Sequence, residues 1–232
     1  MTERTENNRA EGRRGVVQSE QLSGLTPAEQ RQVAALVLRQ WRAPLIACEP
    51  DEVWGIDRSV LESLFRLAAE APGEQRDQAY RQALAVLRTA PLFTSEVDPD
   101  TVQLVQLETI GNLLTFGGLL EDPPTDKVDL IIESSAGLAS YLDGLVEDSY
   151  HSHPSEHAHR QYLADLGYEA HGLGYLAARR SAVESACHRG LRSLPDRAGL
   201  LDSSTGRELL GLCEDFGAEV ATTLQWIRTT GR

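Results

Sequence analysis

Histidine is the residue type whose spacing in this sequence most suggests chemistry. All six histidines lie between residues 151 and 188, and four of them fall within residues 151–159. Imidazole is the commonest metal ligand in proteins, and ligands that are close in the sequence can meet at one ion without long-range folding. The pattern predicts a site for a divalent transition metal, with zinc or nickel ranking ahead of iron, whose candidate ligands are His153, Glu156, His157 and His159.

The cluster between His151 and His171 has two interpretations. Glu156 and His159 have the Glu-x-x-His spacing of di-iron helical bundles. Such bundles need two copies of the motif and further glutamates on facing helices, and the sequence has one clear copy. A solvated loop that enters a helix at Pro154 would show the same run of polar residues. The cluster therefore indicates either a metal-binding helical protein, which includes a metal-dependent enzyme, or a hydrophilic loop.

The negative charge of the chain is concentrated in its middle third. The chain has 35 acidic and 22 basic residues, and its formal net charge is −13. Residues 89–159 contain thirteen of the acids and a single cation, Lys127, so the remainder of the chain is nearly neutral. Such a field repels phosphate backbones and anionic lipids and attracts a basic protein surface. We expect a basic protein partner and neither nucleic acid nor membrane; the other interpretation is an acidic surface that only aids solubility.

The middle third also holds the most regular amphipathic helix that the sequence predicts. Thr125 caps it, and apolar residues recur at helical spacing from Val128 to Val146. Asp129, Glu133 and Asp143 fall on the other face, so we expect them to be exposed and to contact the basic partner. The function that the sequence favours is a soluble helical interaction protein, with the metal-binding protein as the alternative.

Several enzymatic templates are absent from the sequence. Lys127 is the only lysine and no glycine run precedes it, so there is no phosphate-binding GxxxxGK[ST] loop. Asp126 and Asp129 would hold its amine protonated, which disfavours Schiff-base chemistry. There is no Gly-x-Ser-x-Gly elbow, no Cys-x-x-Cys pair and no His-Glu-x-x-His helix. Whether the protein is an enzyme stays open at this stage.

The elements that must position these residues are helices. Capping residues and apolar periodicity predict an all-α bundle of about seven helices, with the longer ones in the C-terminal half. Their approximate ranges are 26–41, 57–71, 74–90, 98–116, 125–150, 154–189 and 205–230. Thr26 and Glu29 have the spacing of a capping box at the start of the first helix, and Asp57 can cap the second. We expect Gly117 and Gly118 to end the fourth helix and the connector between Pro44 and Pro50 to contain a short strand, if any element at all.

The N-terminal segment and the three cysteines indicate the extent of the domain and the compartment of the protein. Residues 1–24 are polar and lack a helical apolar period, which predicts a disordered N-terminal tail followed by a single all-α domain over residues 25–232. The three cysteines are far apart, and the chain lacks an apolar export signal and a long apolar run. We therefore expect reduced thiols and a cytoplasmic protein. Cys213 falls in the apolar stripe of the last helix, which predicts a core position.

Overall fold

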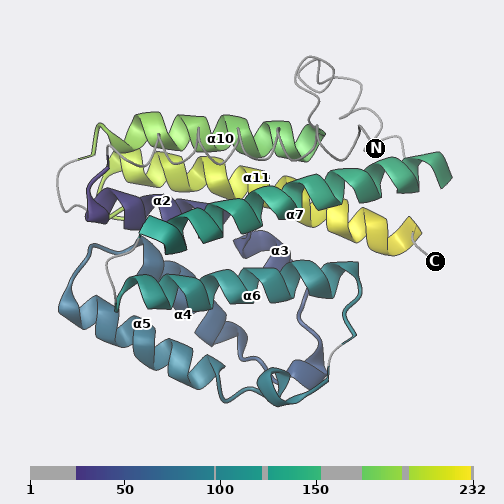
Figure 1. Cartoon of the computed structure of the whole chain (residues 1–232), viewed down its shortest axis with the longest axis horizontal. Coiled ribbons are helices and arrows are strands. Elements are labelled where there is room, and N and C mark those ends of the chain that lie inside the picture. The colour runs from purple at the N-terminus through teal and green to yellow at the C-terminus, as the bar shows by residue number, and fades with distance from the viewer. Residues whose placement is uncertain (1–24, 97, 122–124, 153–173, 195–198, 231–232) are drawn as a thin grey trace, which may run out of the picture.

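The described part of the chain consists of helices and the loops that join them. The computed structural model defines residues 25–96, 98–121, 125–152, 174–194 and 199–230 (Figure 1). In chain order the elements are α2 (Pro27–Gln40), α3 (Arg42–Ala47), the 3₁₀ segment η1 (Glu52–Trp54), α4 (Arg58–Ala69), α5 (Glu74–Leu87), the 3₁₀ segment η2 (Pro91–Thr94), α6 (Thr101–Leu119), α7 (Thr125–Ser152), α10 (Tyr175–Leu191) and α11 (Ser204–Thr230). The predicted all-α helical bundle is confirmed. The two longest of these helices, α7 and α11, lie in the C-terminal half, as expected.

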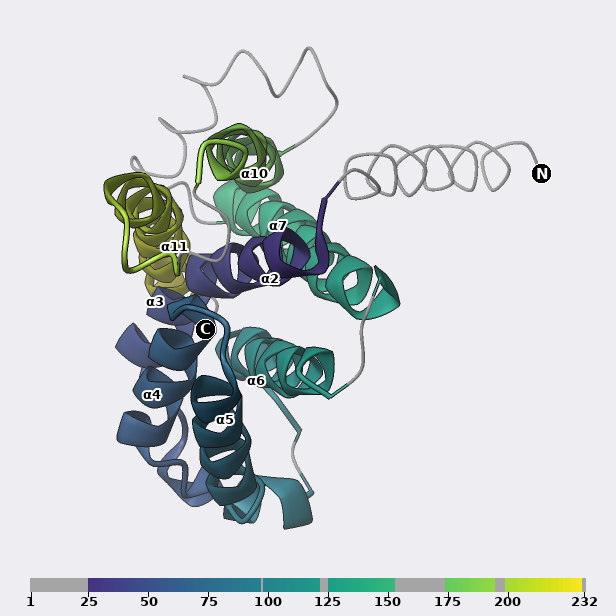
Figure 2. The same ribbon diagram turned by 90° about the vertical axis from the view of Figure 1, so that its left-hand side faces the viewer.

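The innermost helix is α2. It begins with the predicted capping box, in which the Thr26 hydroxyl accepts from the backbone N–H of Glu29 and the Glu29 carboxylate accepts from that of Thr26. The six consecutive residues 33–38 are all buried, so α2 is enclosed on every side rather than on one stripe. Figure 2 shows α2 between an upper layer of α7, α10 and α11 and a lower layer of α4, α5 and α6.

The lower layer is closely packed where α5 meets α6. The fully buried Tyr80 hydroxyl donates to the carbonyl of Leu113 at 2.9 Å, and burial raises the pKa of this phenol far above its usual value. A Cβ at Gly117 would lie 2.1 Å from Cδ1 of Leu84, so the glycine permits the approach of the two helices. Gly117 and Gly118 were expected to end the helix, but α6 continues to Leu119 and contains both glycines in its last turn. Packing against α5 compensates for the cost of glycine inside α6.

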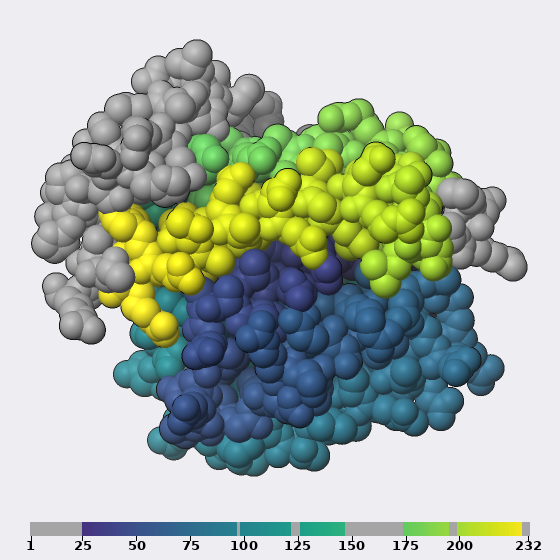
Figure 3. Space-filling model, turned by 180° about the vertical axis from the view of Figure 1, so that it is seen from behind, coloured from purple at the N-terminus to yellow at the C-terminus, as the bar shows by residue number. Residues whose placement is uncertain are grey.

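In the upper layer, α10 and α11 pack against each other. The thiols of Cys187 and Cys213 are buried and face each other, with 3.7 Å between the Sγ atoms. The predicted core position of Cys213 is confirmed. The contact with the Cys187 thiol, together with burial, raises the pKa of Cys213, which keeps this thiol protonated. Seen from behind, α11 runs as a ridge along α2 and α3 (Figure 3).

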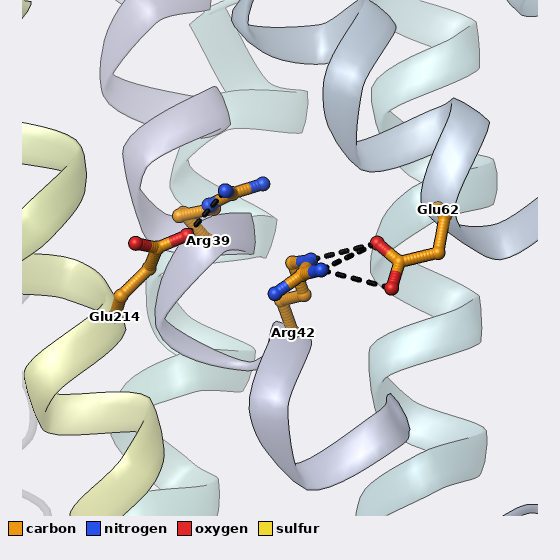
Figure 4. A network of polar contacts seen from close by, with 4 residues as sticks. All are labelled: Arg39, Arg42, Glu62 and Glu214. Atoms are coloured by element: carbon orange, nitrogen blue, oxygen red, sulfur yellow. Dashed lines mark hydrogen bonds and ion pairs between the residues drawn. The ribbon is translucent and has the colours of Figure 1, made fainter. Parts of the chain in front are cut away.

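Ion pairs join the layers at positions outside the acidic middle third. Arg39 of α2 pairs with Glu214 of α11, and the guanidinium of Arg42 in α3 donates twice to Glu62 of α4, at 2.9 and 2.8 Å (Figure 4). Two parallel bonds from one guanidinium fix the orientation of both side chains. In this part of the molecule the carboxylates are thus matched by arginines on neighbouring helices.

The connector after Trp41 differs from the expectation of a short strand. It forms the helix α3, in which Leu45 and Ile46 are buried. Trp41 itself is buried and its indole Nε1 donates to the hydroxyl of Ser135 in α7 at 2.7 Å. Because Trp41 is fixed between α2 and α7, the chain that follows is directed across the core, and burial of its apolar residues there stabilises a helical turn. None of the helices in the described ranges is long and apolar enough to cross a membrane.

Candidate functional site

Two of the acidic residues predicted to contact a partner, Asp129 and Glu133, share one face of α7 with a third acidic residue, Asp126. Asp126, Asp129 and Glu133 are separated by three and four positions, which places them on the same side of a helix. Asp126 and Glu133 are exposed and Asp129 is partly exposed. We call this set the α7 acidic face. Leu130, beside it on the same helix, leaves 55% of its surface exposed, so the acidic face has an apolar neighbour that the core does not cover.

The charges of the α7 acidic face are not balanced within the described residues. None of its three carboxylates forms an ion pair with an arginine, a lysine or a histidine of the described ranges. Partial burial raises the pKa of Asp129, and the neighbouring charges of Glu133 and Asp126 raise it further. The part of this rise in the pKa of Asp129 that comes from Glu133 and Asp126 reflects the negative charge gathered on this face.

Lys127, the single cation of residues 89–159, does not pair with these carboxylates. The ammonium of Lys127 donates to the carbonyl oxygen of Gly118 at 2.9 Å. This carbonyl belongs to the last turn of α6, where it also accepts from the backbone N–H of Glu121, and a cation there interacts favourably with the helix dipole. Lys127 therefore caps α6 and leaves the carboxylates of the α7 acidic face unpaired.

A fourth carboxylate reaches this side of the molecule from α6. The amide of Asn112 donates to the hydroxyl of Ser134 at 2.9 Å, and the Ser134 hydroxyl donates to the carboxylate of Glu108 at 3.3 Å. These bonds hold α6 and α7 together and place the Glu108 carboxylate at Ser134, the chain neighbour of Glu133. The sequence alone does not point to Glu108, because the spacing of residues along α6 does not show that α6 lies beside α7.

Asp143 is not part of this surface, and the expectation that it is exposed is wrong. Only 7% of its surface is accessible, and its two carboxylate oxygens accept hydrogen bonds from the backbone N–H groups of Leu176 and Ala177, both at 2.9 Å. These N–H groups belong to the first turn of α10. Asp143 therefore caps the N-terminus of α10 from the neighbouring helix α7, which covers the carboxylate and removes it from any partner.

The predicted metal ligands lie outside the described residues. This applies to His153, Glu156, His157 and His159, so the metal site stays a prediction. The described ranges themselves contain no group of three or more histidine, cysteine or acidic side chains that could hold an ion. His188 of α10 is described: it is half-buried, and burial lowers the pKa of its imidazole.

Comparison with known proteins does not add a family to this description. No family model, no curated protein and no solved structure matches the chain. The class of protein is therefore defined by the fold alone, as an all-α helical bundle.

Proposed function

We propose that this protein is a binding module that recruits a basic segment of a protein partner through the α7 acidic face. The observation that carries the proposal is the set of carboxylates on α7, at Asp126, Asp129 and Glu133, which have no cationic partner among the described residues. Unpaired like charges repel one another, so a basic partner gains from relieving this repulsion as well as from direct attraction.

The neighbourhood of these carboxylates supports a partner that is basic and partly apolar. Leu130 offers an exposed apolar side chain beside the acidic residues, and Glu108 adds a carboxylate from α6. An apolar side chain next to charged ones gives a partner an apolar contact in addition to the ionic ones. An arginine-rich amphipathic segment would match both features.

The test is the rate at which the protein binds a synthetic arginine-rich amphipathic peptide at low salt. The double charge reversal D129K/E133K should slow association about tenfold, because the attraction that guides the encounter is lost. The substitution L130A should instead speed dissociation and leave the association rate nearly unchanged. Stopped-flow fluorescence at several salt concentrations measures both rates.

A matched control separates a local site from total charge. The variant E208K/D215K on α11 makes the same change in net charge at two exposed carboxylates far along the chain. It should leave the association rate close to that of the unaltered protein. Equal slowing by both double variants, or association that does not respond to ionic strength, would contradict the proposal.

A further inference from the structure

The thiols of Cys187 in α10 and Cys213 in α11 are in contact in the core of the upper layer. Their Sγ atoms are 3.7 Å apart, although the residues are 26 positions apart in the sequence. Both side chains are buried. The sulfur–sulfur distance of a disulfide is about 2.05 Å, so each sulfur has to move by about 0.8 Å, which modest rotations about the two Cα–Cβ bonds supply.

The two helices that carry these thiols lie close together at this point (Figure 1). A Cβ at Gly190, three residues after Cys187, would lie 2.7 Å from Cδ2 of Leu209, which is four residues before Cys213. The lack of a side chain at Gly190 therefore lets α11 approach α10 closely, one helical turn from the thiols. A disulfide needs such an approach, because the Cα atoms that it joins are usually about 4–7 Å apart.

The surroundings of the two thiols suit a disulfide better than a thiolate. The hydrogen bond with Cys187, together with burial, raises the pKa of Cys213. A thiolate here would place a charge in the core, whereas a disulfide is uncharged and apolar. The folded protein can therefore hold the two sulfurs as thiols or as a disulfide, but the thiolate that starts an exchange reaction forms only when the core opens.

The polar residues that α10 buries favour its local opening. Arg180 and Glu184 are buried on this helix and form an ion pair at 3.1 Å. Within the described residues, Oε1 of Glu184 and Nε2 of His188 are buried and have no hydrogen-bond partner. Water solvates these groups when α10 separates from the bundle, which lowers the free energy of local opening. The same movement exposes both thiols.

We propose that Cys187 and Cys213 are a reversible dithiol–disulfide pair, which cross-links α10 to α11 when a small-molecule disulfide such as glutathione disulfide is in excess. The thiolate of one cysteine attacks a sulfur of the oxidant, breaks its S–S bond and releases one small thiol, which leaves a mixed disulfide on the protein. The second thiolate attacks the protein sulfur of this mixed disulfide and releases the second small thiol. Two electrons and two protons thus pass from the protein thiols to the oxidant. The pair does not depend on the binding function proposed for α7.

Cys48 provides an internal control. It is the third cysteine of the chain and lies at the C-cap of α3, where it is buried as well. Burial raises the pKa of its thiol. An oxidant that reaches buried thiols without regard to their geometry would modify Cys48 too, whereas the proposed pair leaves it free.

The test counts free thiols in the full-length protein after equilibration in buffers that contain glutathione and glutathione disulfide in different ratios. Excess N-ethylmaleimide in urea stops the exchange, and mass spectrometry counts and locates the labels. Excess glutathione should give labels on all three cysteines. Excess glutathione disulfide should leave a label on Cys48 alone, and dithiothreitol should restore the others. The same buffers are applied during refolding from urea, so slow access to the buried thiols cannot imitate a negative result.

Thermal unfolding measures the effect of the cross-link. The oxidised protein should unfold at a temperature about 5–10 °C higher than the reduced protein, because the disulfide restricts the unfolded chain. Cys48→Ala is the matched control and should retain this shift. Cys213→Ala should form no disulfide within the chain and should show no shift. Should Cys213→Ala not retain its helix content by circular dichroism, Cys187→Ala replaces it, with the same expectation.

Three results would overturn the inference. The first is an unaltered protein that keeps all three thiols free after refolding in excess glutathione disulfide. The second is a disulfide that includes Cys48 or joins two chains in place of the bond between Cys187 and Cys213. The third is a disulfide-linked protein that unfolds at a lower temperature than the reduced protein, because α10 and α11 would then not be positioned for the bond.

Discussion

The two halves of α7 carry the same side chain in opposite environments. In the N-terminal half, Asp129 lies on an open face next to Glu133, and the repulsion between these charges contributes to the raised pKa of Asp129. In the C-terminal half, Asp143 is buried and its carboxylate accepts two backbone hydrogen bonds from α10. One carboxylate is therefore available to a partner, and the other is part of the fold.

The difference follows from which helices cover α7. Figure 1 shows α10 beside the part of α7 that carries Asp143, and α10 begins there with N–H groups that need acceptors. A carboxylate at a helix N-terminus is stabilised by those donors and by the helix dipole. At Asp129 no such donors meet the side chain in the described structure. The comparison predicts that substitutions in the two halves have effects of different size and sign.

The largest effect is expected at Asp143. Asp143→Ala should lower the free energy of unfolding by about 3 kcal/mol, because two buried charge-assisted hydrogen bonds are lost and two N–H groups of α10 are left without acceptors. Asp143→Asn should cost less, since its amide oxygen can still accept one of the bonds. Urea unfolding followed by circular dichroism measures both. The comparison fails if Asp129→Ala, which removes an exposed carboxylate, destabilises the protein as much as Asp143→Ala.

A smaller effect is expected from two glycines near this contact. A Cβ at Gly174 would lie 2.1 Å from Cγ of Asp143, so Gly174→Ala should displace the capping carboxylate and destabilise the protein by about 1–3 kcal/mol. A Cβ at Gly144, one residue after Asp143 on α7, would meet no atom within 4 Å. Gly144→Ala should therefore stabilise the helix by up to about 1 kcal/mol. Thermal unfolding of the pair gives the two signs, and a gain in stability from Gly174→Ala would show that α10 does not start against Asp143.

The smallest effect is expected at Asp129 and depends on pH. Because its pKa is higher in the folded than in the unfolded protein, ionised Asp129 favours unfolding. Asp129→Asn should raise the free energy of unfolding at neutral pH, by less than about 1 kcal/mol at this partly exposed site. The gain should shrink as the pH falls through the folded pKa and vanish below the ordinary aspartate value of 3.8, where both states are protonated. Urea unfolding at several pH values tests this, and a gain that persists in acid would exclude charge repulsion as its cause.

Local signals in the sequence were sufficient for most of the described helices, with α3 as an exception, and for some of their starts. The Thr26 capping box and the cap at Asp57 are where they were predicted, because the atoms involved are within three residues of one another. The start of α6 was predicted at Asp98 but lies at Asp100, whose capping box with Gln103 is equally local. Such boundaries commonly shift by one or two residues when two capping residues compete.

The candidate site was predictable only in part, for a related reason. Helical spacing correctly put Asp129 and Glu133 on one accessible face, but it also put Asp143 there. Glu108 gave no signal, because the residue pattern of α6 does not show that α7 lies beside it. The surroundings of such a residue depend on which helices pack together, and the apolar periodicity of a single helix does not show which helix is its neighbour.

The sequence by itself determined the all-α class, the approximate helices and the concentration of negative charge in residues 89–159, because propensity, capping and composition act over a few residues or over the whole chain. Only the tertiary structure decided that Asp143 is an internal cap, that Lys127 closes the end of α6 and that Arg76 is buried. Each of the two caps requires a donor or an acceptor from another helix, and the burial of Arg76 requires that other helices cover α5. A charged side chain is stabilised or destabilised by the groups that surround it, and those groups are assembled only when the helices pack.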